Sequence, residues 1–105
     1  PHFSMQIEVA KLEELPNREG FLFRSGPHQI ALFRLENEVR AIDNVCPHAG
    51  ASLADGYTDG EVVACPWHCW EFSTKTGKCS TISGCEVEVY PVVVEDGIVK
   101  IELPE

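Results

Sequence analysis

The sequence has few basic residues and no long apolar run. Eight Lys and Arg stand against 17 Asp and Glu, so the net charge is −9, and such a surface suits neither nucleic acid nor an anionic membrane. No apolar run approaches the roughly 18 residues of a membrane-spanning helix, and the start lacks the basic and then apolar segments of a signal peptide. We therefore expect a cytoplasmic protein that binds neither nucleic acid nor membranes. The charge favours a partner with a basic docking patch, or serves solubility alone.

The number of cysteines, five, argues against a disulfide scaffold. An odd number in a chain of 105 residues argues against paired cysteines and favours a reducing compartment. The length predicts one domain, residues 1–105, which is short for a large catalytic cleft. Met5 resembles a natural first residue, so we interpret Pro1–Ser4, including His2, as an added remnant.

The hydrophobic pattern predicts an almost wholly β protein. Strands are expected at Gln6–Ala10, Phe21–Arg24, Ile30–Leu35, Val39–Ile42, Glu61–Cys65, Trp70–Thr74, Val87–Val94 and Ile98–Leu103. Asp96-Gly97 predicts a tight hairpin, and Lys11–Pro16 holds one helical turn at most. Asn44–Gly60 is rich in Pro, Gly, Ala and Asp and is interpreted as loop. The predicted fold class is all-β, an antiparallel β-sandwich or barrel base with an inserted metal-binding lobe at about residues 44–84.

Two near-identical segments carry the chemistry. Cys46-Pro47-His48 is followed, after sixteen residues, by Cys65-Pro66-Trp67-His68. Together they offer two thiolates and two imidazoles, the ligand set of a Rieske [2Fe–2S] cluster with two Cys on one iron and two His on the other. Pro47 and Pro66 stiffen the loops, and Gly50 and Gly56 allow close approach of the backbone. Zinc sites with two Cys and two His usually show CxxC followed by HxxxH, so a zinc-bound or metal-free module is the weaker interpretation.

These segments resemble the Rieske ferredoxins. The family pattern CxHxGxxL and CPxHG is met by Cys46, His48, Gly50, Leu53, Cys65, Pro66 and His68. The resemblance implies a base of antiparallel sheets that carries two ligand loops on a small lobe. It also implies that Cys46 and Cys65 bind the buried iron of one [2Fe–2S] cluster, while His48 and His68 bind the outer iron and face a docking partner. Leu53 would shield the cluster.

The resemblance implies electron transfer rather than catalysis. The chain would accept single electrons from an NAD(P)H-dependent, flavin-containing reductase and donate them to a terminal oxygenase component. The alternative is the small subunit of an NAD(P)H nitrite reductase, whose large subunit would then be the partner. No nucleophile, acid–base pair or substrate pocket is legible in the sequence, so we expect no enzymatic activity of its own.

Five positions depart from patterns found in the family. Cys69 follows His68 where the family usually has Gly. High-potential Rieske proteins carry an extra disulfide, but the matching residues here are Ala51 and Trp67. Those proteins also place a Ser and a Tyr to hydrogen-bond the cluster sulfurs, where this chain has Trp70 and Phe72. Fewer donors stabilise the added electron less, so we predict a potential at the low end of the span of about −150 to +300 mV for Rieske centres.

The other cysteines and the tryptophans are assigned structural roles. Cys69, Cys79 and Cys85 are interpreted as free thiols or small core residues and not as ligands. Cys79 and Cys85 would form a disulfide only if the intervening loop brought them together, and a reducing cytosol disfavours that bond. Trp67 and Trp70 are expected to pack around the lobe, with a docking role on its rim as the alternative.

Overall fold

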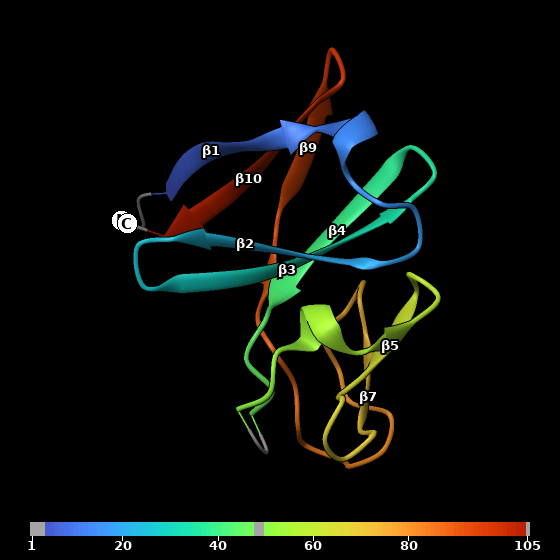
Figure 1. The fold of residues 1–105 in the computed structure, drawn as a ribbon. Coiled ribbons are helices and arrows are strands. Elements are labelled where there is room, and N and C mark those ends of the chain that lie inside the picture. Colours follow the sequence, from blue (N-terminus) through green and yellow to red (C-terminus); the bar gives the residue numbers. More distant parts are fainter. Residues whose placement is uncertain (1–3, 48–49, 105) are drawn as a thin grey trace.

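Three antiparallel sheets make up the fold in the computed structural model, which describes residues 4–47 and 50–104 (Figure 1). The first contains β1 (Ser4–Lys11), β10 (Ile98–Pro104) and β9 (Val92–Glu95), in that order. The second contains β2 (Gly20–Ser25), β3 (His28–Leu35), β4 (Glu38–Asp43) and β8 (Val89–Tyr90). The third contains β5 (Tyr57–Thr58), β6 (Val62–Ala64) and β7 (Glu71–Ser73), and two 3₁₀ turns lie at η1 (Leu12–Glu14) and η2 (Leu53–Asp55). The all-β prediction is confirmed.

The central strand β3 separates two hydrophobic cores. Ile30 and Leu32 pack with Val99 of β10 in one core, whereas Ala31 and Phe33 pack into the other. Successive side chains of a strand point to opposite faces, so a strand that is apolar at four positions in a row is buried on both sides. The second sheet is therefore the middle layer, with the first sheet on one face and the lobe around β5–β7 on the other (Figure 1).

The C-terminal strands differ from the prediction at one point. The expected strand Val87–Val94 is two strands, because β8 pairs with β4 and β9 pairs with β10 in another sheet. Pro91 lies between them and has no N–H to donate to a ladder, so the chain changes sheets there. The hairpin at Asp96-Gly97 is confirmed: both residues have positive φ, 52° and 76°, as a type I′ turn requires.

The lobe contains more regular structure than its composition predicts. Within Asn44–Gly60, which we expected to be loop, η2 and β5 form. A buried hydroxyl fastens the lobe to the middle layer: Thr74 Oγ1 donates to the carbonyl of Gly60 at 2.7 Å and accepts from Arg40 Nη1 of β4 at 3.2 Å. Among the described residues, no helix has the length and apolar character needed to cross a membrane.

Candidate metal centre

Each of the two predicted ligand loops has the same pair of backbone hydrogen bonds, which we call the loop frame. In the first, the N–H of Cys46 donates to the carbonyl of Ala51 at 3.0 Å, and the N–H of Gly50 donates back to the carbonyl of Cys46 at 2.8 Å. In the second, Cys65 donates to Trp70 at 2.8 Å, and Cys69 donates back to Cys65 at 2.8 Å. The spacings are identical, five residues forward and four back, so the similarity of the two sequences extends to their backbones.

In each frame, the residue that donates back to the cysteine has a left-handed backbone conformation. Gly50 has φ 74° and Cys69 has φ 57°. Glycine adopts this region without steric cost, whereas a residue with a Cβ is strained there. The unusual Cys69 therefore occupies the position at which the first loop uses glycine. Its side chain is exposed, so it points away from the lobe core.

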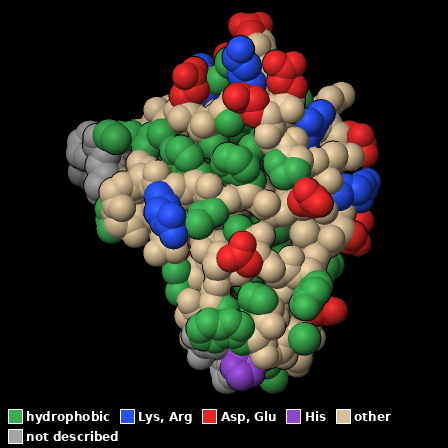
Figure 2. All heavy atoms as spheres, in the orientation of Figure 1, with side chains coloured by type: hydrophobic (Ala, Val, Ile, Leu, Met, Phe, Trp, Pro, Cys, Tyr) green, Lys and Arg blue, Asp and Glu red, His purple; other side chains and the backbone are tan. Residues whose placement is uncertain are grey.

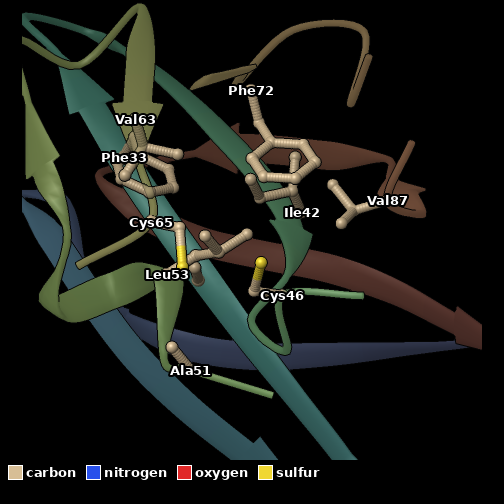
Figure 3. Close-up of a cluster of buried hydrophobic side chains, with 10 residues drawn as sticks. Phe33, Ile42, Cys46, Ala51, Leu53, Val63, Cys65, Phe72 and Val87 are labelled. Carbon is tan, nitrogen blue, oxygen red and sulfur yellow. The ribbon is translucent and has the colours of Figure 1, made fainter. Parts of the chain in front are cut away.

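Cys46 and Cys65 lie in the same buried core (Figure 3). They are 1% and 0% exposed, and they share this core with Leu53 and Phe72, both 0% exposed. Two cysteines from loops that are distant in sequence are thus brought together under an apolar cover. Such packing keeps water from a sulfur-ligated centre, and Leu53 lies where the resemblance predicts a shielding residue.

The second loop ends at the surface. His68 is exposed and Trp67 is 65% exposed, whereas the half-buried Trp70 packs against the lobe core. The prediction that both tryptophans pack around the lobe is therefore right for Trp70 and wrong for Trp67. Trp67 stands in the sequence between the buried Cys65 and the exposed His68, where the chain reaches the surface. Figure 2 shows a histidine side chain at the lower tip of the molecule beside hydrophobic side chains, with most acidic side chains on the upper part of this face.

The donors present suit a sulfur- and nitrogen-ligated iron centre. The two buried cysteines could supply soft thiolate ligands, and the exposed His68 could supply an imidazole three residues beyond Cys65. The fourth predicted ligand, His48, lies outside the described residues. Within residues 4–47 and 50–104, no three His, Cys, Asp or Glu side chains already stand in a group that could hold a metal ion.

Asn44 holds the first ligand loop, a role that the sequence analysis did not assign. Its side chain is 1% exposed. Its amide Nδ2 donates to Ser52 Oγ at 2.9 Å, and its Oδ1 accepts from the N–H of Ala54 at 2.8 Å. Its own carbonyl accepts from the N–H of Leu53 at 2.8 Å. One buried side chain thus closes the loop that carries Cys46, and the only sequence signal was a polar residue directly after an apolar strand.

Among the described residues of the lobe and its edge, Asp59 and Cys85 have shifted pKa values. Hydrogen bonds from the N–H groups of Val62 and Glu61 lower the pKa of Asp59, because they stabilise its carboxylate in the turn before β6. Partial burial raises the pKa of the Cys85 thiol, and the neighbouring thiols of Cys79 and Cys46 add to the effect. Cys85 therefore lies close to a predicted ligand.

The Rieske [2Fe-2S] domain model matches residues 5–91 of this chain. The 3-phenylpropionate/cinnamic acid dioxygenase ferredoxin subunit of Photorhabdus laumondii is 37% identical over 102 residues, which are 95% of this chain and 96% of that protein.

Solved structures share the fold. The complex of reduced oxygenase and oxidised ferredoxin in carbazole 1,9a-dioxygenase contains a chain that is 28% identical, with a TM-score of 0.81 and 91% of each chain covered. A Mycobacterium tuberculosis protein, proposed to be the small subunit of an NADH-dependent nitrite reductase, is 26% identical, with a TM-score of 0.85 and 96% of each chain covered. Similarity thus extends to both of the protein classes that the sequence left open.

Proposed function

This chain belongs to the Rieske [2Fe–2S] domain family, and on that premise we propose that it carries single electrons to a terminal oxygenase component. The donor is an NAD(P)H-dependent, flavin-containing reductase, and the protein has no catalytic activity of its own. Residues 1–105 act as one domain in the cytoplasm, with the cluster-binding lobe at about 44–84. Curated relatives that are ferredoxin components of dioxygenase systems support this assignment.

The proposed ligands of one [2Fe–2S] cluster are Cys46, His48, Cys65 and His68. When bound, the cluster supplies a one-electron redox couple. The two thiolates would neutralise much of the charge of the iron that they hold, inside a core from which Leu53 and Phe72 exclude water. The imidazole of His68 lies at the surface, where an electron has a short path to a docked partner.

The repeated loop frame is the observation that carries the proposal. Each frame begins with a cysteine that is no more than 1% exposed and closes four residues later at a residue with positive φ. In the second frame the histidine stands one residue before that closure. Zinc sites with two Cys and two His usually show CxxC followed by HxxxH, whereas each segment here has one Cys and one His, the donors that a cluster with two Cys on one iron and two His on the other would need.

The side chains at positions 70 and 72 favour a low reduction potential, because neither carries a hydroxyl group. Trp70 and Phe72 occupy positions where high-potential proteins of the resembled class place hydroxyl side chains. Phe72 is 0% exposed and packs in the lobe core, so it offers no hydrogen bond to a cluster sulfur. Without such bonds the reduced state is stabilised less, which suits an electron donor to an oxygenase.

The alternative is the small subunit of an NAD(P)H nitrite reductase. It is supported by the TM-score of 0.85 to the proposed Mycobacterium tuberculosis subunit. The two functions differ in their partner, since the nitrite reductase large subunit carries sirohaem and an aromatic-ring oxygenase does not.

An electron-transfer experiment separates the two functions. The dithionite-reduced protein is freed of excess reductant and mixed anaerobically with a terminal oxygenase or with a sirohaem-containing large subunit, each from the native host. Stoichiometric reoxidation of this protein and reduction of the oxygenase centre support the proposal. Reduction of the sirohaem partner alone, together with its stable co-purification, assigns the chain to the nitrite reductase instead.

A further inference from the structure

Cys79 and Cys85 face each other across a short antiparallel ladder. Lys78 and Glu86 form an isolated antiparallel bridge. Beside it, the N–H of Cys79 donates to the carbonyl of Cys85 at 3.0 Å. Residues 80–84 form the loop that joins the two sides. Directly opposed residues of an antiparallel pair have Cα atoms about 4.5–5.5 Å apart, and disulfides span about 4.4–6.8 Å, so the backbone already has the spacing that a disulfide needs.

The two side chains also lie on the same side of this ladder. Both pack against the lobe core, as expected for opposed residues of an antiparallel pair. The N–H of Ile82 donates to Sγ of Cys79 at 3.4 Å, which fixes the direction of that side chain. The loop therefore holds the two sulfur atoms together in the reduced protein.

Small reagents can reach the pair. One hollow of about 380 Å³ is lined by Lys78, Cys79, Ser83, Gly84, Cys85 and Glu86. Another, of about 400 Å³, also contains Cys85 in its wall. Both cysteines are only half-buried, whereas Cys46 and Cys65 are enclosed. An oxidant in solution would therefore meet Cys79 and Cys85 before it met Cys46 or Cys65.

We propose that Cys79 and Cys85 are an oxidative modification site, a dithiol that a low-molecular-weight disulfide such as glutathione disulfide converts to an intramolecular disulfide. Cys79 attacks one sulfur of the small disulfide, forming a mixed disulfide and releasing one small thiol. Cys85 then attacks the Cys79 sulfur, which closes the Cys79–Cys85 bond and releases the second small thiol. The Cys79–Cys85 dithiol loses two electrons and two protons. The small disulfide takes them up as it is reduced to two thiols. The site does not depend on the electron-transfer function proposed above.

The test uses the cluster-loaded protein in buffers of fixed ratio of reduced to oxidised glutathione. After an acid quench the remaining thiols are alkylated, and the digested protein is analysed by mass spectrometry. The proposal predicts a linked Cys79–Cys85 peptide, lighter by two hydrogen atoms than the reduced pair. Its fraction should vary with the glutathione ratio as a two-electron couple does, a tenfold change in equilibrium constant for each ~30 mV. The visible absorbance of the cluster should not change.

Single variants provide the controls. Cys79→Ser and Cys85→Ser should each stop at a mixed disulfide with glutathione on the remaining cysteine, whereas Cys69→Ser should give the same linked peptide as the wild type. Full alkylation of both Cys79 and Cys85 in excess glutathione disulfide would overturn the proposal. Linkage of either residue to Cys46, Cys65 or Cys69 in place of the predicted pair would overturn it as well. The wild-type measurement decides the question even if a serine variant fails to fold.

Discussion

Gly50 and Cys69 are equivalent residues in two copies of one loop. The N–H of each donates at 2.8 Å to the carbonyl of the cysteine four residues earlier, Cys46 and Cys65 respectively. Each has a positive φ, 74° at Gly50 and 57° at Cys69. The second ligand loop therefore has a strained cysteine at the left-handed position where the first loop has a glycine.

Replacing Cys69 by glycine should stabilise the protein. Relief of the left-handed conformation is worth roughly 1–2 kcal/mol, and the greater freedom of glycine in the unfolded chain offsets roughly 0.5–1 kcal/mol of this. Cys69→Gly should therefore raise the free energy of unfolding by about 0.5–1 kcal/mol in denaturant titrations. Cys69→Ser, which removes the thiol but keeps a Cβ, is the control and should leave stability unchanged. A Cys69→Gly variant less stable than the serine control would contradict the strain argument.

Removing the Asn44 side chain should weaken the first ligand loop. Asn44→Ala leaves the half-buried Ser52 hydroxyl and Ala54 N–H without their partner, and an unsatisfied group away from water costs about 1–3 kcal/mol. We expect a loss of about 3 kcal/mol in unfolding free energy and less iron bound per chain after purification. Ser52→Ala removes a single hydrogen-bond partner, so it should cost about 1 kcal/mol. Equal effects of the two variants would show that Asn44 has no special role in this loop.

A hydroxyl at position 72 should raise the reduction potential. Phe72 stands where the resembled high-potential proteins place a Tyr, so Phe72→Tyr should restore a donor to a cluster sulfur. One hydrogen bond worth about 1 kcal/mol corresponds to roughly 40 mV for a one-electron couple. Redox titration followed by visible circular dichroism measures the shift. The matched variant Phe33→Tyr adds a hydroxyl elsewhere in the same core and should leave the potential unchanged, so an equal shift in both would refute the assigned role of position 72.

Stability should fall in acid through Asp59. Its pKa lies below the ordinary value of 3.8 because the N–H groups of Val62 and Glu61 stabilise the carboxylate. A carboxyl group with a lowered pKa contributes stability above its unfolded-state pKa and loses that contribution as the pH falls through the folded-state value. Wild type should therefore be more stable than Asp59→Asn at pH 7, and the difference should shrink as the pH falls below the ordinary value of 3.8 and through the folded-state pKa. Urea unfolding followed by tryptophan fluorescence would show it, and a difference that persists unchanged in acid would exclude Asp59 as the cause.

The sequence predicts the sheets well where hydrophobic periodicity is strong, and less well where tertiary contacts decide. The apolar run in β3 is a strand because both of its faces are covered. The continuous pattern of Val87–Val94 concealed a change of sheet, since periodicity does not say which neighbour a strand will pair with. The short β5 and η2 are stabilised by packing against β6 and β2 and have no pattern of their own.

The structure places the two predicted cysteines, Cys46 and Cys65, in one core, but the sequence did not predict the residues that support their loops. The spacing of Cys46 and Cys65 relative to their histidines predicted the paired loops, because each ligand segment is local in sequence. The roles of Asn44 and of Cys79 with Cys85 depend on contacts between segments that only the folded chain brings together. A buried amide and a pair of opposed thiols have no sequence signature of comparable strength.

The central claim is that Cys46, His48, Cys65 and His68 hold a two-iron cluster with mixed sulfur and nitrogen ligation. The most direct test is EPR of the dithionite-reduced protein, with iron and sulfide measured on the same sample. We expect equal amounts of iron and sulfide and a rhombic signal with an average g of about 1.9, as two histidine ligands on one iron imply. His68→Cys should move that signal toward the form given by four cysteine ligands. Zinc in place of iron with no EPR signal, or a signal that His68→Cys leaves unchanged, would contradict it.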